Sequence, residues 1–252
     1  LQVLGLDVAR EAAALRRRLG VVFQSPSLDP ELTARENLEC HGRLYGLGRR
    51  QLAERTRAVL ARLDLAERSG DRVKTLSGGL RRRVEIAKCL LASPRLLLLD
   101  EPSTGLDPGA RRSLWELLAR LREEEGVTIL LTTHFIEEAD RCDRLLLLDR
   151  GRVVAQGTPE ALKRGLGGEV VTLTAADPEA LASELAQRFG VRAEVSNDEV
   201  RFVHPAARGL VARLADSLAG RYRSLTVAEP TLEHVFLART GRGLENQPEA
   251  AT

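Results

Sequence analysis

The sequence lacks methionine altogether, and it has only three cysteines and 3% aromatic residues in 252 positions. So few aromatic rings argue against a platform on which nucleic-acid bases stack. A net charge of only +2 argues against a basic surface that binds a phosphate backbone. We therefore expect no nucleic-acid partner. Cys40, Cys89 and Cys142 are too widely spaced for a metal site or a C-x-x-C pair, so we expect reduced thiols in a cytosolic protein.

Long apolar runs are also missing. The longest, Leu96–Leu99 and Leu145–Leu148, fall far short of the roughly 18–20 residues that a membrane-spanning helix needs. No signal peptide is recognisable. If the protein works at a membrane, we expect another chain to supply the membrane-spanning segments.

One phosphate-binding motif is absent as well. The loop G-x-x-x-x-G-K-[ST], whose backbone N–H groups and lysine hold nucleotide phosphates, occurs nowhere in the chain. The chain also begins at Leu1 rather than at a methionine. We therefore expect that the sequence is truncated at its N-terminus.

An apolar core and a regular alternation of strands and helices are present. Hydrophobic residues make up 43% of the chain, which is enough for a buried core. The run Leu96–Leu99 is typical of a strand buried on both faces of a parallel sheet, and a predicted helix at 108–125 follows it. Residues 31–68 predict helical structure that begins with Thr33 and Glu36 as a capping box. The alternation predicts an α/β fold with a mainly parallel sheet.

Glycines near residue 165 mark a predicted linker between two domains. Residues 1–165 contain the alternation of the α/β domain. Residues 166–240 predict a small α+β accessory domain, whose strand–helix–strand–strand–helix–strand order is that of a ferredoxin-like unit. Residues 241–252 are polar and predict a disordered tail.

Two adjacent carboxylates follow the buried strand, in the stretch LLLLDEP at 96–102. Ligands of open parallel sheets bind at the carboxyl ends of the strands. Asp100 can hold Mg²⁺ there, since Mg²⁺ prefers oxygen ligands, and Glu101 can orient and polarise an attacking water. The alternative is a strand that ends in solvated acids, and the pair alone does not decide between the two.

Two other polar residues follow predicted strands of the same sheet. Gln24 comes after the strand Gly20–Phe23, and its amide can accept from a metal-bound water and donate to a phosphate oxygen. His134 comes after a strand at 127–132, where an imidazole could hydrogen-bond a γ-phosphate and sense its loss. A lone histidine at such a place is more often structural, and a glutamine after a strand is commonplace. Each residue therefore indicates a functional site only in combination with Asp100 and Glu101.

The stretch LSGGLRRR at 76–83 has the composition of a helix start that binds phosphate. Ser77 supplies a hydroxyl, and Gly78 and Gly79 allow the backbone to approach a ligand closely. The N–H groups and the dipole of a helix N-terminus attract anions. The alternative is a capped helix with an arginine-rich solvated face, and we expect Arg81–Arg83 on the surface of the helix.

The loop STGLD at 103–107 predicts the start of the next helix. Asp107 is the expected N-cap and Pro108 the first helical residue. The alternative to a functional role for Asp107 is simply a loop with a good cap, and the residue can serve in both ways.

Taken in order, VVFQ, LSGGLRRR, LLLLDEPSTGLD and LLTTH resemble the ATP-binding subunit of an ABC transporter, over about residues 1–165. The resemblance implies a P-loop NTPase-type ABC ATPase domain, with a mainly parallel sheet and a helical subdomain. It also implies ATP and Mg²⁺ as cofactors and ATP hydrolysis as the reaction. Its implied site consists of Glu101 and His134 as catalytic residues, Ser77, Gly78, Gly79 and Asp107 as nucleotide-binding residues, and Gln24 and Asp100 as metal-binding residues.

Further stretches resemble the daunorubicin-type drug-export ATPases of the ABC-2 class, namely GLRRRVEIA, TTHFIEEADRCDR, GRVVAQGTPEAL and TLEHVFLARTG. This resemblance implies export of a drug or another hydrophobic compound. The implied partners are ABC-2 type transmembrane permease subunits, contacted at about residues 25–45, and a second ATP-binding subunit that we expect to be an identical copy. The implied location is the cytoplasmic face of the cell membrane, held there by the permease.

The sequence departs from the family pattern in three places. Leu80 stands where many members have Gln or Met, and His234 stands where this subfamily often has Asp. The phosphate-binding loop and the aromatic residue that stacks on adenine are absent, so we expect this stretch alone to bind ATP poorly and to hydrolyse it negligibly. Two alternatives remain open, a non-transport soluble ABC ATPase and a catalytically inactive interaction fragment.

Overall fold

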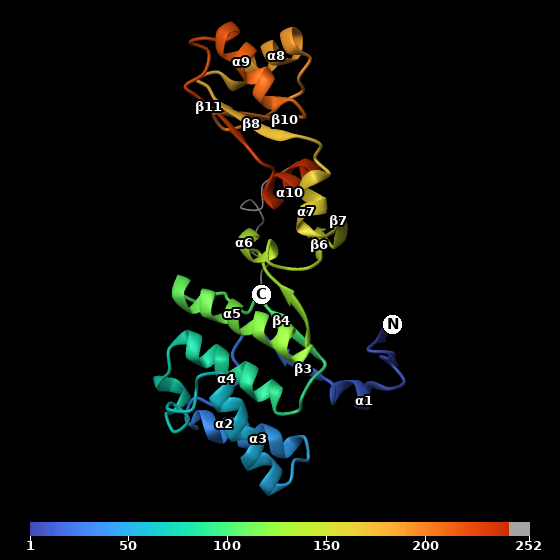
Figure 1. Ribbon diagram of the computed structural model, residues 1–252, viewed down its shortest axis with the longest axis vertical. Coiled ribbons are helices and arrows are strands. Elements are labelled where there is room, and N and C mark those ends of the chain that lie inside the picture. The colour runs from blue at the N-terminus through green and yellow to red at the C-terminus, as the bar shows by residue number, and fades with distance from the viewer. Residues whose placement is uncertain (242–252) are drawn as a thin grey trace. The chain divides into compact units, whose positions relative to one another are not determined.

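The computed structural model describes residues 1–241, so all of the predicted disordered tail except Gly241 lies outside the described residues. The chain divides into two compact units, Leu1–His134 and Phe135–Thr252 (Figure 1). Each unit has a hydrophobic core cluster of its own. The predicted domain boundary after residue 165 stays a prediction.

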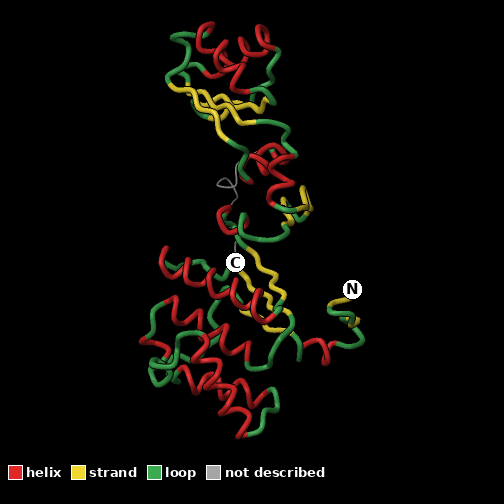
Figure 2. The backbone as a smooth tube through the Cα atoms, in the orientation of Figure 1, coloured by secondary structure: helices red, strands yellow, loops and turns green. Residues whose placement is uncertain are grey.

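The first unit contains a three-stranded parallel sheet in the order β3-β4-β5. Its strands are β3 (Leu19–Val22), β4 (Leu96–Asp100) and β5 (Thr128–Thr132), coloured as strands in Figure 2. In this register Asp100 lies opposite Thr132. The parallel pairing confirms the predicted sheet and brings the carboxyl ends of the three strands to one edge.

The two faces of the sheet differ in exposure, because side chains alternate along each strand. Val22 and Leu99 are buried in a core cluster that also contains residues of α4 (Gly78–Leu90) and α5 (Pro108–Glu125). On the opposite face, Leu130 is 59% exposed. Helices α4 and α5 therefore cover one face of the sheet.

The remaining helices of the first unit follow from local sequence signals. Residues 31–68, predicted as helical, form two helices, because the chain turns at the glycine-containing segment 45–48. Thr33 caps the first of them in the predicted capping box with Glu36, and Asp107 caps α5 as predicted. The two helices of this segment are α2 (Ala34–Leu44) and α3 (Arg49–Arg62), and α1 (Ala12–Arg16) precedes them. The unit also has the short strands β1 (Gln2–Val3) and β2 (Leu6–Asp7) and a 3₁₀ turn at Val73–Thr75.

Helix α4 packs very closely on strand β3. A Cβ atom added to Gly20 would lie 2.7 Å from the Cβ of Cys89 and 2.5 Å from Cδ2 of Leu97, so a side chain at this position does not fit. The Cys89 thiol donates to the Val21 carbonyl at 3.4 Å. Burial raises the pKa of this thiol to about 11, so it stays neutral and unreactive. None of the three cysteines, which all lie within residues 1–241, forms a disulfide, and this agrees with the predicted thiols.

The second unit begins with short elements. Helix α6 (Ile136–Ala139) leads to an antiparallel hairpin of β6 (Leu145–Asp149) and β7 (Arg152–Gly157), followed by helix α7 (Pro159–Arg164). The last described helix, α10 (Leu232–Thr240), contacts α7, β7 and α6. The end of the described chain therefore packs on the segment that opens this unit.

The rest of the second unit is a four-stranded antiparallel sheet with two helices. The sheet has the order β11-β8-β10-β9. Its strand–helix–strand–strand–helix–strand sequence is that of a ferredoxin-like motif, as expected from the sequence. The elements are β8 (Glu169–Thr174), α8 (Pro178–Phe189), β9 (Glu194–Ser196), β10 (Glu199–His204), α9 (Ala207–Ser217) and β11 (Ser224–Ala228).

Candidate functional site

Glu101 is the centre of a polar cluster at the carboxyl edge of the parallel sheet. Gln24, just past β3, donates from Nε2 to Oε2 of Glu101 at 3.3 Å. Thr104 donates from Oγ1 to the same oxygen at 3.0 Å. His134, just past β5, places Nδ1 3.4 Å from Oε1 of Glu101. The structure thus brings together three of the predicted residues, one from each strand end.

Asp100 and Glu101 are linked to β5 by one threonine. The Thr132 hydroxyl donates to Oδ1 of Asp100 at 2.5 Å and accepts from the backbone N–H of Glu101 at 3.0 Å. Sequence reasoning did not single out Thr132 or Thr104. The role of Thr132 depends on the register between β4 and β5, which sets Asp100 opposite Thr132 and which no local sequence signal specifies.

The backbone turns sharply at Glu101. Its φ angle is +42°, in the left-handed region that side-chain-bearing residues rarely adopt. A regular strand would point the side chains of Asp100 and Glu101 to opposite faces. The left-handed residue ends the alternation and directs the Glu101 carboxylate to the edge where Gln24 and His134 lie.

The LSGG stretch lies at the start of α4. Ser77 is the N-cap, and its Oγ accepts from the Leu80 N–H at 3.3 Å. A Cβ atom on Gly79 would lie 2.8 Å from the Cβ of Ala110 in the first turn of α5, so Gly79 allows two helices to approach closely. Gly78 is exposed. The structure therefore gives Gly79 a packing role within the chain and leaves Ser77 and Gly78 at the surface.

Asp107 has the structural role that its sequence context predicts. Its Oδ1 accepts from the Ala110 N–H at 2.9 Å, which caps α5, and Pro108 is the first helical residue. The residue is exposed. The start of α5 and the start of α4 therefore lie side by side, joined by the contact between Gly79 and Ala110.

One expectation about the arginines after LSGG is wrong. Arg82 is only 7% exposed and pairs with the buried Glu85, while Arg81 is exposed as expected. Arg83 is partly buried and donates to the Leu63 carbonyl and to Asp64. Three consecutive residues span about 200° around a helix, and α4 is buried on more than one side, so one of the three arginines points into the protein.

The donors at this edge fit a hard cation. Asp100 offers a carboxylate and Gln24 an amide oxygen, and these are the ligand types that Mg²⁺ prefers. Within residues 1–241, however, no three His, Cys, Asp or Glu side chains are grouped to hold a metal by themselves. Water and nucleotide oxygens would therefore supply most of the ligands of a Mg²⁺ bound here.

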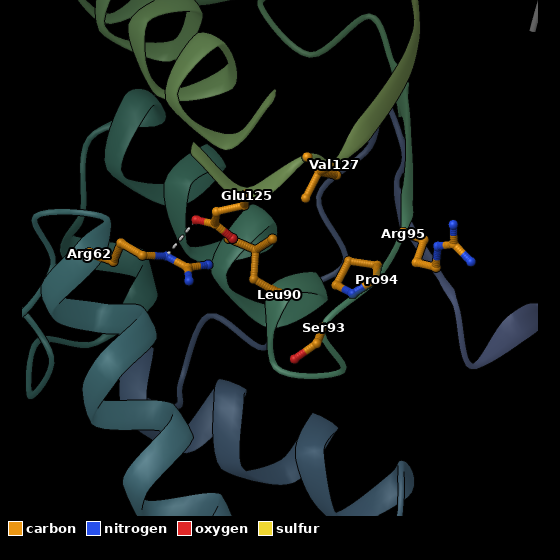
Figure 3. Close-up of a pocket in the computed structure, with 8 residues that line it drawn as sticks. Arg62, Leu90, Ser93, Pro94, Arg95, Glu125 and Val127 are labelled. Atoms are coloured by element: carbon orange, nitrogen blue, oxygen red, sulfur yellow. Dashed lines mark ion pairs between the residues drawn. The ribbon is translucent and has the colours of Figure 1, made fainter. Parts of the chain in front are cut away.

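A separate pocket of about 270 Å³ lies at the opposite edge of the sheet (Figure 3). Arg95, which precedes β4, and Val127, which precedes β5, are among its lining residues. Arg62 forms an ion pair with Glu125 across it at 3.1 Å. Because the pocket lies at the amino ends of the strands, it is distinct from the cluster around Glu101.

Comparison with known proteins finds close relatives over nearly the whole chain. An ABC transporter family model matches residues 1–104, and an AAA domain model matches residues 79–138. The Nod factor export ATP-binding protein I of Rhizobium sp. (strain N33) is 41% identical over 247 residues, which is 97% of this chain and 80% of the relative. The daunorubicin resistance ATP-binding protein DrrA3 of Streptomyces coeruleorubidus is 38% identical over 252 residues, which is 96% of this chain and 78% of the relative.

Solved structures give the same picture for the fold. An ATP-binding subunit of an ABC transporter aligns with a TM-score of 0.56 at 32% identity, covering 66% of this chain and 69% of that one. The cbiO1 protein of Clostridium perfringens, part of the ABC transporter complex cbiONQ, aligns with a TM-score of 0.57 at 26% identity, covering 73% of this chain and 69% of that one.

Proposed function

The chain belongs to the ATP-binding subunits of ABC transporters, and from that premise we propose that the cluster around Glu101, together with a phosphate-binding loop that these 252 residues do not contain, hydrolyses ATP to power export of drugs or other hydrophobic compounds. Members of the family bind ATP and are transport ATPases. The observation that carries the assignment of the site is the convergence of Gln24 and His134 on the Glu101 carboxylate.

Glu101 is the proposed general base. Its carboxylate accepts from Gln24 and Thr104 at Oε2, yet an ionised carboxylate has about four acceptor positions in all. A water on the carboxylate can therefore be oriented for attack on the γ-phosphorus while Glu101 draws off its proton. Gln24 would help to fix that water, because its amide has both a donor and an acceptor.

His134 is the proposed sensor of the γ-phosphate. It is 53% exposed and lies beside Oε1 of Glu101, so its ring is open to a ligand on the same edge. An imidazole N–H can donate to a phosphate oxygen, and that hydrogen bond disappears once the γ-phosphate leaves. Asp100 and Gln24 would hold Mg²⁺, which would supply positive charge to the phosphate oxygens.

We further propose that a second copy of the chain completes the nucleotide site. Ser77 and Gly78 lie exposed at the N-terminus of α4, where free N–H groups and the helix dipole favour an anion. Asp107 lies near them at the start of α5. In this proposal the LSGG stretch of one copy faces the γ-phosphate of the nucleotide on the other copy.

Transmembrane partners are inferred from the family. ABC ATP-binding subunits work with transmembrane permease components, and no helix within residues 1–241 has the length and apolar character to cross a bilayer. We propose ABC-2 type permease subunits as the partners, contacted through residues 25–45, and a peripheral position at the cytoplasmic face of the membrane.

The compound that is exported can be tested directly. We expect inside-out membrane vesicles that carry the assembled transporter to accumulate daunorubicin when ATP is supplied outside, because daunorubicin resistance proteins are among the relatives. Vesicles with Glu101→Gln are the control for ATP-driven transport. ATP-dependent accumulation of Nod factor instead of daunorubicin would retain the exporter but contradict the proposed drug substrate.

Thr132→Val is expected to lower the turnover number for ATP by about 10-fold while changing stability by no more than about 1 kcal/mol. The substitution removes the hydroxyl that joins Asp100 to the Glu101 backbone, and Thr132 is exposed, so water can replace the lost partners in the folded chain. Steady-state ATP hydrolysis and thermal unfolding measure the two effects. Thr132→Ser keeps the hydroxyl and should retain most of the activity; equal losses in both variants would contradict this role.

A further inference from the structure

The loop that follows β3 is held against helix α4 by buried charged side chains. Arg82 donates from Nη1 to the Phe23 carbonyl at 2.8 Å and from Nη2 to the Gln24 carbonyl at 3.2 Å. The same guanidinium donates to Oε2 of Glu85 at 2.8 Å. One planar fork therefore holds two successive backbone carbonyls and a carboxylate.

Two further residues of α4 hold the loop from the next turns of the helix. Glu85 accepts from the Ser27 N–H at 2.8 Å through its second oxygen, Oε1. Lys88 donates to the Ser27 carbonyl at 3.0 Å and to the Ser27 hydroxyl at 2.6 Å. Arg82, Glu85 and Lys88 are spaced three residues apart, so they lie along one side of the helix.

The burial of this group shows that it is not a surface ion pair. Arg82 is 7% exposed and Glu85 is 2% exposed. Buried charges cost desolvation energy, and a well-packed apolar pair of similar volume is often as stable or more stable. Stability alone therefore gives no reason for a buried arginine and a buried glutamate here, whereas the three hydrogen bonds that Arg82 and Glu85 make with the loop backbone do.

The loop is also the segment that carries Gln24. The Gln24 backbone carbonyl is held by Arg82, and the Gln24 side chain donates to Glu101. Helix α4 itself starts at Ser77, its exposed N-cap. A helix moves as a rigid element, so a displacement of its start reaches the loop through these three side chains.

We propose that Arg82, Glu85 and Lys88 are positioning residues that fix Gln24 against Glu101 and couple its position to the start of α4. This inference rests on the proposed ATP hydrolysis at Glu101. When nucleotide contact moves the start of α4, the three side chains carry the loop with it and set the distance between the Gln24 amide and the Glu101 carboxylate.

Arg82→Lys is the first test. Lysine keeps the positive charge beside Glu85 but lacks the planar fork, so it cannot hold both carbonyls and the carboxylate. In the assembled transporter we expect the turnover number for ATP to fall about 10-fold, with the KM for ATP within about 2-fold of wild type, because the loop shifts while the binding contacts remain. Arg81→Lys is the matched control, since Arg81 is exposed one position earlier on the same helix.

A second variant separates positioning from stability. Arg82→Met combined with Glu85→Leu removes both charges, so no buried charge is left unpaired and the fold should persist. We expect thermal stability close to wild type, slow turnover, and faster hydrogen exchange of the peptide that contains Ser27, whose N–H loses its acceptor. Wild-type turnover in this folded double variant would overturn the positioning role.

The outcomes distinguish this inference from the proposed function. If wild-type transporter shows no hydrolysis that depends on Glu101, the proposed function fails and the positioning role falls with it. If wild type hydrolyses ATP and Arg82→Lys has the same turnover number as Arg81→Lys, only the positioning role is overturned. Slow turnover together with faster exchange at Ser27, in a stable protein, supports both.

Discussion

Glu101→Gln is expected to reduce ATP hydrolysis by the assembled transporter at least about 100-fold while ATP binding persists. The amide has nearly the shape of the carboxylate but cannot take a proton from water at neutral pH. Its carbonyl oxygen can still accept from Gln24 and Thr104, as the carboxylate does. The loss should therefore fall on the turnover number rather than on affinity.

Two measurements and one control define this result. Phosphate release gives the turnover number, and labelled ATP retained after rapid gel filtration gives the bound nucleotide. Glu124→Gln makes the same chemical change at an exposed glutamate of α5 and should hydrolyse ATP at the wild-type rate. Near-normal turnover in Glu101→Gln would contradict the assignment of Glu101 as the general base.

A heterodimer of two different inactive variants is expected to hydrolyse ATP, although the homodimer of each variant does not. If LSGG of one copy completes the site of the other, Ser77→Arg in one copy and Glu101→Gln in the other place both lesions in the same composite site. The second composite site is then intact. With independent sites, such a heterodimer should keep roughly half of the wild-type rate, while both parent homodimers are inactive.

The reverse arrangement gives the opposite expectation. When both substitutions are on one copy and its partner is wild type, each composite site contains one lesion and the dimer should be inactive. A site built within a single chain inverts the two results, because the wild-type copy would then keep its own intact site. Differently tagged copies, purified in sequence and assayed for phosphate release, allow the comparison; equal rates in the two arrangements would contradict the shared site.

The sequence predicted those parts of the fold that local signals control. Asp107 and Pro108 define the start of α5, and the capping box of Thr33 with Glu36 defines the start of α2. The LLLLD run predicts a buried strand, and it is the central strand of the parallel sheet. Caps and uninterrupted apolar runs depend on neighbouring residues only, so they can be recognised without knowledge of the tertiary structure.

The candidate site was predicted only in part, for a physical reason. Gln24, Glu101 and His134 follow predicted strands, so their meeting at one sheet edge could be inferred. Thr132 depends on the register between two strands, and the burial of Arg82 depends on which face of α4 meets the loop after β3. Both are set by packing between segments distant in the sequence, which local patterns do not encode.

The left-handed backbone at Glu101 makes stability and activity compete at a single position. A side-chain-bearing residue in this region costs roughly 1–3 kcal/mol, whereas glycine adopts it without strain. Selection for thermal stability alone would therefore favour glycine at position 101 and remove the carboxylate. A directed-evolution experiment on this chain that screens only for stability would be expected to lose its proposed chemistry first at that residue.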